Sequence, residues 1–151
     1  MFWSVVRRDA GPKILFYHDI GTNYTGMGTA RTVFWAHMKR LAESSSGFRH
    51  RVCFDDGYRG IWDERKRLGE LVGDGLRVDV FIAIDLVGLP GFLTWDEICA
   101  LEKDYGLHVQ CHTWSHQTLI GEMLGDRSER ETDKQNRVTP AWCRRELVES
   151  K

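Results

Sequence analysis

The stretch RVCFDDG, residues 51–57, decides the fold that we expect for this chain of 151 residues. A short apolar run bounded by a turn signal predicts a buried β-strand, and Gly57 permits a sharp turn directly after it. Asp55 and Asp56 stand between the strand and the turn. In α/β proteins the carboxyl ends of parallel strands carry the functional site, so this stretch predicts a strand together with two site residues.

The same order of strand and helix repeats along the chain. Short apolar runs alternate with amphipathic stretches, which favours the α/β class with a parallel sheet covered by helices. The runs are too apolar for strands that face water. The predicted strands are residues 13–17, 51–54, 78–83 and 107–111, and the predicted helices are residues 32–43, 60–72, 94–105 and 140–149.

Two threonines are predicted to cap helices. Thr32 follows a loop rich in Gly, Thr and Asn and precedes an apolar stripe, so it is the expected N-cap of the first helix. Thr94 is the expected N-cap of the third helix, in which Trp95, Ile98 and Leu101 should face the core.

Length and composition indicate one domain, residues 1–151. The formal net charge is −1 and the basic residues are scattered, so neither nucleic acid nor an anionic membrane surface is an expected partner. No apolar run approaches the roughly 20 residues of a transmembrane helix. The N-terminus lacks the pattern of a signal peptide, which indicates a cytoplasmic protein, or an exported one if the true N-terminus is missing.

The four cysteines form no C-x-x-C pair, which argues against a zinc ribbon. They are Cys53, Cys99, Cys111 and Cys143. We expect buried free thiols, because Cys53 and Cys111 fall in strand-like runs and a free cysteine behaves as a small hydrophobic residue. Two disulfides are the alternative for an exported protein. The polar stretch 121–139 is predicted to be a surface loop rather than a lid.

Polar side chains follow all of the predicted strands. They are His18, the pair Asp55 and Asp56, Asp85, and the pair His112 and His116. Because the carboxyl ends of parallel strands meet at one edge of a sheet, we expect these side chains to form one site.

The stretch HTWSH, residues 112–116, carries two histidines four positions apart. On a helical turn this spacing places both imidazoles on one face, within reach of one ion. With Asp56 they form three ligands with open positions, which suits zinc and other first-row divalent ions. Thr113 replaces the Glu that serves as base in the H-E-x-x-H motif, so Asp55 is the candidate base.

Each of these motifs also has an ordinary structural explanation. An Asp-Asp-Gly sequence forms solvated turns in many proteins. Two histidines can lie on the surface or in the core without a metal. The coincidence of several such residues at successive strand ends therefore carries more weight than either motif alone.

Three motifs in order resemble those of one enzyme family. Residues 52–58, VCFDDGY, resemble its T-F-D-D-G motif, with Cys53 at the usual Thr position. Residues 112–116 resemble its H-[ST]-x-x-H motif, and residues 15–20, LFYHDI, resemble the Y-H-x-[IV] opening of one branch. Together they make the chain similar to the polysaccharide deacetylase family, or NodB-homology domain.

The resemblance implies a partial or distorted (β/α) barrel of the glycoside hydrolase/deacetylase type, with about four βα units. It implies a metal-dependent deacetylase that hydrolyses N-acetyl groups, or less often O-acetyl groups, on a polysaccharide or glycan. Asp55 is implied as the catalytic base. The implied ligands of one divalent ion are Asp56, His112 and His116, with zinc preferred and cobalt or nickel as alternatives.

Further residues gain roles only through this resemblance. Thr113 and Ser115 are implied as supports that fix the imidazoles. His18 either lines the mouth of the site or is satisfied by local hydrogen bonds. Tyr58 and Trp114 either stack on a sugar ring or serve in packing.

The sequence also departs from the family pattern. The later family motifs, which contain Arg and Pro, Asp and Trp, and Leu-x-His, are not found, so a missing C-terminal part is expected. No histidine follows His116, and the pattern assigns no general acid.

Two alternatives to an active deacetylase remain open. The chain is a truncated or degenerate member that binds metal or glycan without efficient turnover, or, more remotely, a non-haem iron oxygenase. An incomplete barrel would also expose a sheet edge, which predicts either self-association into a homo-oligomer or marginal stability.

Overall fold

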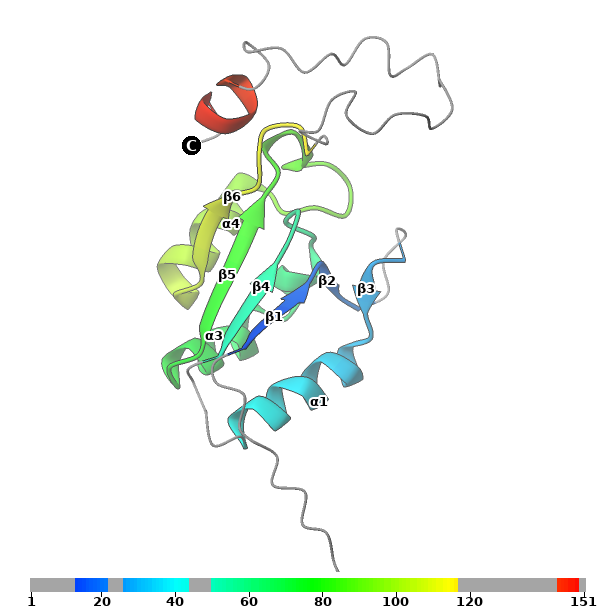
Figure 1. Cartoon of the computed structure of the whole chain (residues 1–151), viewed down its shortest axis with the longest axis vertical. Coiled ribbons are helices and arrows are strands. Elements are labelled where there is room, and N and C mark those ends of the chain that lie inside the picture. Colours follow the sequence, from blue (N-terminus) through cyan, green and yellow to red (C-terminus); the bar gives the residue numbers. More distant parts are fainter. Residues whose placement is uncertain (1–12, 22–25, 44–49, 117–143, 150–151) are drawn as a thin grey trace, which may run out of the picture.

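A computed structural model of the chain describes residues 13–21, 26–43, 50–116 and 144–149 (Figure 1). The strands are β1 (Ile14–Tyr17), β2 (Asp19–Ile20), β3 (Gly28–Thr29), β4 (Arg51–Phe54), β5 (Arg77–Ile82) and β6 (His108–Cys111). The helices are α1 (Arg31–Ala42), α2 (Gly60–Asp63), α3 (Arg65–Gly73), α4 (Trp95–Tyr105), the 3₁₀ turn η2 (Ile84–Leu86) and the π-helical turn η4 (Arg145–Glu149).

The main sheet confirms the predicted α/β class. Its strand order is β1-β4-β5-β6, and all three pairings are parallel. Helices connect successive strands, as parallel pairing requires. The strands that the structure describes form an open sheet and no closed barrel, which agrees with the predicted partial barrel. A second, two-stranded sheet of β2 and β3 was not predicted, because β3 lies in the stretch expected to be a loop.

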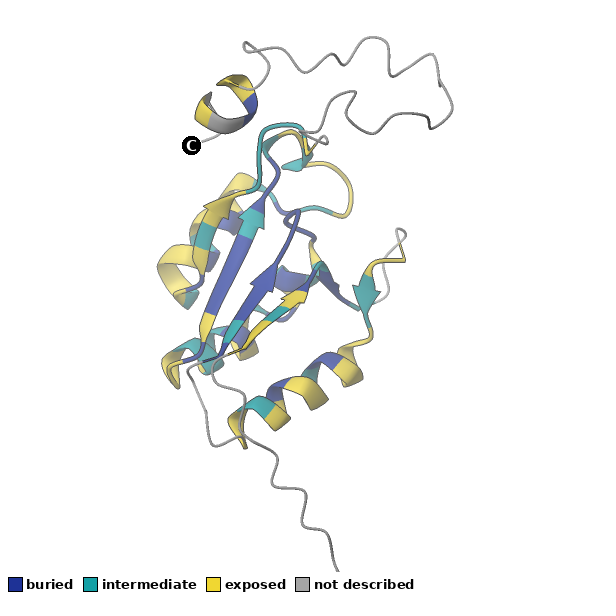
Figure 2. Ribbon diagram, viewed as in Figure 1, coloured by how far each residue is buried: buried dark blue, intermediate teal, exposed yellow. Residues whose placement is uncertain are grey.

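One face of the sheet packs against the helices and forms the core. The strand residues of this face include Val52, Phe54, Val78, Val80 and Ile82, all nearly or fully buried. Figure 2 shows the result as dark blue central strands, β4 and β5, between more exposed edge strands. Central strands in an α/β sheet are buried because helices and neighbouring strands shield them together.

The outer strands correct the prediction that all strands are too apolar to face water. On β1, Ile14 and Phe16 are 65% and 54% exposed. They alternate with Leu15 and Tyr17, so they point to the opposite face of the sheet, which these helices do not cover. The exposed apolar side chains agree with an incomplete barrel, and self-association through the open sheet edge stays a prediction.

A charge cluster lies on this second face, where the buried Asp79 is paired with the half-exposed side chains of Arg51 and Arg77. Asp79 lies beside Cys53 in the sheet register and is fully buried. Arg51 Nη2 and Arg77 Nη2 donate to its two carboxylate oxygens at 2.8 and 3.0 Å. Burial alone would raise the pKa of Asp79, but the hydrogen bonds from Arg77 and Arg51 outweigh it and hold the pKa below its ordinary value.

The first two helices differ from their predictions. Helix α1 begins at Arg31, after Ala30 as N-cap, so the predicted cap at Thr32 is wrong. The predicted helix 60–72 is broken at Glu64 into α2 and α3. Glu64 is 7% exposed and its carboxylate accepts from the indole N–H of Trp35 and pairs with Arg31. These tertiary contacts accompany a change of backbone direction that periodicity does not reveal.

Helix α4 has the predicted cap, and Ile98 and Leu101 face the core as predicted. The Thr94 side chain accepts from the Glu97 N–H and the Glu97 side chain accepts from the Thr94 N–H, which completes a capping box. Trp95 is 53% exposed, so its predicted inward position is wrong. Leu93, which precedes the cap, is buried instead and joins Ile98 in the core, the arrangement of a hydrophobic staple.

The prediction of buried free thiols is correct only for Cys53. Cys99 and Cys111 are free as well but exposed. Cys111 is exposed because β6 lies at the edge of the sheet. Cys143, the stretch 121–139 and residues 140–143 of the predicted last helix lie outside the described residues. Among the residues described, no helix has the length and apolar character needed to cross a membrane.

The charge cluster gives a stability prediction. We expect Asp79→Asn to lower the free energy of unfolding at pH 7 by about 1–3 kcal/mol, because charged hydrogen bonds to a buried carboxylate are lost. The pKa of Asp79 is depressed on folding, so its contribution is full above the unfolded pKa of about 3.9 and is lost as the pH falls toward the folded value.

Urea denaturation between pH 7 and pH 3 measures this difference. The gap between wild type and Asp79→Asn should shrink below about pH 3.9. Asp104→Asn, on the exposed surface of α4, is the matched control and should change little. A gap that stays constant or grows as the pH falls would contradict the assignment.

Candidate metal centre

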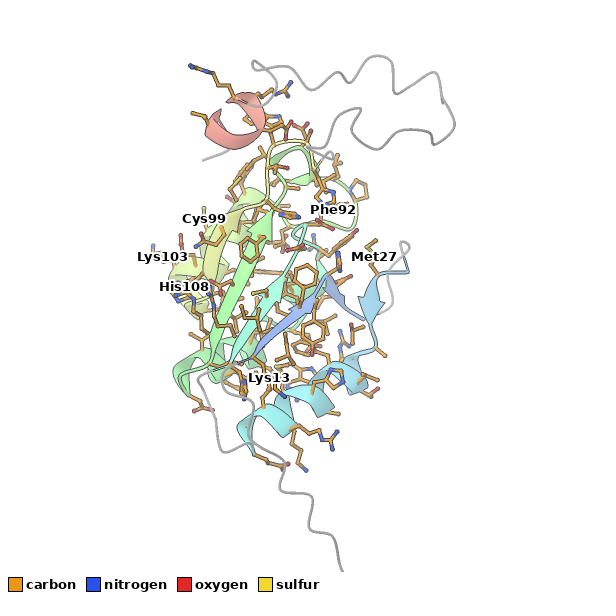
Figure 3. All side chains as sticks on the ribbon, viewed as in Figure 1. Lys13, Met27, Phe92, Cys99, Lys103 and His108 are labelled. Atoms are coloured by element: carbon orange, nitrogen blue, oxygen red, sulfur yellow. The ribbon has the colours of Figure 1, made fainter. Side chains whose placement is uncertain are left out.

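The carboxyl ends of the strands bring the predicted site residues to one edge of the sheet. The Asp55 N–H donates to the Tyr17 carbonyl at 3.0 Å, and the His112 N–H donates to the Ile82 carbonyl at 2.8 Å. Each bond continues a strand pairing by one residue, so the two side chains are placed by the sheet itself. In Figure 3, the labelled Phe92 marks this end of the sheet and the labelled Lys13 marks the opposite end.

Three side chains converge there. Asp56 Oδ1 lies 3.0 Å from His116 Nε2 and 3.6 Å from His112 Nε2. The ligand atoms of the three residues all lie within 4.8 Å of one another. Asp55 stands beside them, with Oδ2 3.3 Å from His112 Nε2. The structure therefore brings together Asp55, Asp56, His112 and His116, whereas Asp85, which was expected in the same site, is exposed and outside this group.

The carboxylate of Asp56 is incompletely satisfied. Asp56 is 4% exposed, and its Oδ1 has no hydrogen-bond partner among the described residues. His116 Nε2 lies 3.0 Å from Oδ1, but the two atoms do not form a hydrogen bond, so Oδ1 has no partner among the described residues. A buried carboxylate oxygen without a donor is costly. Two imidazole nitrogens and one such oxygen fit a divalent cation, which would satisfy all three.

The backbone at these residues is strained. Asp56, Thr113 and His116 have φ values of 66°, 67° and 56°, and they are the positive-φ residues other than glycine in the described part of the chain. Such conformations cost about 1–3 kcal/mol each and persist where surrounding contacts determine them. Gly57, at φ 79°, completes the turn after β4, as the sequence predicted. Strain concentrated at one cluster is typical of a functional site.

The histidine loop, residues 112–116, is not the predicted helical turn. Its two imidazoles nevertheless lie close, with ring centroids 4.9 Å apart. The loop is held from the η2 side, where the N–H groups of Ile84 and Asp85 donate to the carbonyls of Thr113 and Trp114 at 3.3 and 2.9 Å. The i, i+4 spacing gave the correct proximity for a reason other than helical geometry.

Asp55 has the environment expected for a proton acceptor. Burial raises the pKa of its carboxyl above the ordinary value, while the nearby His112 opposes the shift and the charge of Asp56 adds to it. Because Asp55 lies beside Asp56, His112 and His116, a second carboxylate is close to any ion or ligand that these three residues bind.

The remaining predicted residues lie around this centre. His18 is half-buried and packs edge-on against Phe16, with ring centroids 5.2 Å apart. Tyr58 is 7% exposed and stacks on Phe92 at 4.7 Å, as the packing alternative expects. Trp114 is half-buried, and the guanidinium of Arg145 lies 5.0 Å from its ring centroid.

The hydroxyls of the implied supports bond to the loop backbone and to the Glu146 side chain rather than to the imidazoles. The Thr113 hydroxyl accepts from the His116 N–H at 3.1 Å, and the Ser115 hydroxyl donates to Glu146 at 2.7 Å. Sequence reasoning missed Glu146. An acidic residue in a predicted amphipathic helix carries no signal for a contact with a loop 31 residues away.

Comparison with known proteins identifies the fold. No family model matches the sequence, and no curated protein is significantly similar to it. Among solved structures, a candidate polysaccharide deacetylase of Bacillus anthracis has a TM-score of 0.63 at 19% identity, over 93% of this chain and 45% of that one. A polysaccharide deacetylase of Bacillus cereus gives 0.57 at 20% identity, over 82% and 45%.

The chain has the fold of the polysaccharide deacetylases. A de-N-acetylase of Aggregatibacter actinomycetemcomitans shares it as well, with a TM-score of 0.52 at 15% identity over 67% of this chain and 54% of that one. The chain spans between 45% and 54% of the lengths of these three structures. The predicted deacetylase-type fold is therefore confirmed for a unit about half as long as its structural neighbours.

The unsatisfied oxygen gives a prediction for the metal-free chain. We expect Asp56→Asn to raise the free energy of unfolding by about 1 kcal/mol in the presence of a chelator, because a neutral amide costs less to bury than a carboxylate whose Oδ1 has no donor among the described residues. Asparagine also tolerates the positive φ of this position better than most residues. Chemical denaturation with EDTA measures the change.

The control for this prediction is Asp85→Asn, which removes an exposed carboxylate at the same end of the sheet. It should alter stability by no more than about 0.5 kcal/mol. A destabilised Asp56→Asn variant would mean that Oδ1 is better satisfied than the geometry indicates.

Proposed function

We propose that this chain carries the metal-dependent active site of a deacetylase that hydrolyses N-acetyl groups on a glycan. The observation that supports the proposal most directly is the convergence of Asp56 Oδ1, which lacks a hydrogen-bond partner among the described residues, with two histidine nitrogens. Asp55, adjacent in sequence and 3.3 Å from His112, supplies the second carboxylate that hydrolysis requires.

The proposed ligands of one divalent ion are Asp56, His112 and His116. Two imidazoles and one carboxylate suit zinc with open coordination positions, and cobalt or nickel would fit the same donors. A bound ion would supply Lewis acidity and lower the pKa of a coordinated water. His112 and His116 are 31% and 45% exposed at their side chains, so the histidine side of the centre is open to solvent and to a substrate.

The proposed role of Asp55 is to accept a proton from the attacking water. The carboxylate is largely buried, at 9% exposure, which holds it in place at the edge of the centre. In hydrolysis of an acetamido group, water adds to the acyl carbon, the C–N bond breaks, and acetate and an amine result. The amine must gain a proton as it leaves, and the proton taken up by Asp55 is available for that step.

The proposed substrate is a carbohydrate bearing N-acetyl groups, with O-acetyl esters as the less favoured class. Support comes from the shared fold with polysaccharide deacetylases of two Bacillus species and with the de-N-acetylase. Trp114 and His18 border the centre and are the proposed sugar contacts. Because Tyr58 is stacked on Phe92, we propose that it lines the site through packing and does not itself stack on the sugar.

A binding module is the second candidate function. It is favoured by the uncovered sheet face, where Phe16, which packs against His18, is 54% exposed, because an incomplete enclosure admits bulk water to this face. The metal and the glycan would then be bound without efficient turnover. Acetate release separates this candidate from an enzyme.

The experiment compares release of acetate from an N-acetylated chitooligosaccharide by the zinc-loaded and EDTA-treated protein. We expect zinc-dependent release by wild type. Asp55→Asn should retain the metal and lower the rate at least 100-fold, the usual scale of general base catalysis. His116→Ala should lose both metal and activity, whereas His108→Ala, on the exposed side of β6, should change neither.

Two results would count against the enzyme. Zinc bound with dependence on His116, but acetate release no faster than that of Asp55→Asn, would support the binding module. Equal zinc binding by wild type and His116→Ala would refute the proposed metal centre.

A further inference from the structure

A buried carboxylate from the C-terminal segment accepts several hydrogen bonds from the histidine loop. Glu146, on η4, accepts the N–H of Trp114 at 2.9 Å and the N–H of Ser115 at 2.8 Å, both through Oε2. Its Oε1 accepts the Ser115 hydroxyl at 2.7 Å. In Figure 1, η4 lies beyond the end of the sheet toward which the β5 arrow points.

The surroundings of Glu146 match a fixed anion. The residue is 1% exposed. Burial by itself would raise the pKa of the carboxyl, but the hydrogen bonds from Ser115 and Trp114 outweigh burial and hold the pKa below its ordinary value. Hydrogen bonds to an ionised acceptor are about twice as strong as those between neutral groups. A rigid and charged acceptor is therefore available to hold backbone donors in one geometry.

Glu146 contacts the histidine loop between its two residues with positive φ. Trp114 and Ser115 lie between Thr113 and His116, the two loop residues with positive φ. On the opposite side, the carbonyls of Thr113 and Trp114 accept from η2. The loop is thus held through its carbonyls on one side and through its N–H groups on the other.

Without Glu146, one of these two sides would be lost. The N–H groups of Trp114 and Ser115 would have to turn toward water, and the strained φ angles around them would be free to relax. Because His112 and His116 flank this segment directly, relaxation would move the two imidazoles apart.

We propose that Glu146 is a positioning residue that holds His112 and His116 at the separation a metal ion requires. The inference rests on the proposed metal centre. Glu146 makes none of the three ligand contacts itself, and it acts through the backbone between the two histidines. The C-terminal segment is in this way part of the metal centre although it supplies no ligand.

The experiment measures zinc affinity by competition titration and, separately, amide hydrogen exchange at Trp114 and Ser115 in the metal-free protein. We expect Glu146→Ala to weaken zinc binding about 10- to 100-fold, the usual effect of removing a group that orients metal ligands. Exchange at both amides should become faster in the same variant.

Glu146→Gln separates geometry from charge. Its amide oxygen can take the place of Oε2 and accept both N–H groups, so zinc affinity should stay within about tenfold of wild type. Ser115→Ala removes one donor and keeps the two backbone contacts, so its loss should be smaller than that of Glu146→Ala. Glu102→Ala, an exposed glutamate of α4, is the matched control and should bind zinc as wild type does.

The outcomes distinguish this inference from the proposed function. Failure of wild type to bind zinc would refute the metal centre, while faster amide exchange in Glu146→Ala would still support its hold on the loop. Zinc affinity unchanged in Glu146→Ala would overturn the positioning role. A loss in Glu146→Gln as large as that in Glu146→Ala would overturn it too, because the amide oxygen of Gln keeps an acceptor for both backbone N–H groups.

Discussion

The close approach of Asp56 Oδ1 to the Nε2 atoms of His112 and His116 is the constraint on which the rest of the site depends. A buried carboxylate oxygen without a hydrogen bond is unfavourable in a metal-free chain, and three positive-φ residues add further cost at the same place. Stability elsewhere offsets that cost: the parallel sheet fixes Asp55 and His112 through its ladder, while η2 and Glu146 fix the loop between the histidines.

Local sequence signals predicted the elements of the fold where local physics decides them. The strand at 51–54 and the capping box at Thr94 follow from apolar runs and short-range hydrogen bonds. Prediction failed where a distant partner decides. The helix break at Glu64 accompanies contacts with α1, and the exposure of Phe16 depends on what covers the far face of the sheet. The residues next to Glu64 and Phe16 in the sequence do not reveal which distant segments contact or cover them.

The candidate site followed the same division. Strand-end positions and the spacing of the histidines predicted the side chains that converge, because the carboxyl ends of parallel strands share one edge. The conformation of residues 112–116 was wrong, since two positive-φ residues replace the expected helical turn. Glu146 was missed because its contacts with Trp114 and Ser115 span more than 30 positions of the chain, a separation that only tertiary packing can establish.

X-ray absorption spectroscopy of the zinc-loaded protein would report which atoms surround the ion. We expect one zinc per chain with only nitrogen and oxygen neighbours at about 2.0–2.1 Å, and scattering from two imidazoles. Cys111, exposed and adjacent to His112, offers the competing donor. A sulfur neighbour at about 2.3 Å, or fewer than two imidazoles, would contradict the assignment of Asp56, His112 and His116 as the ligands.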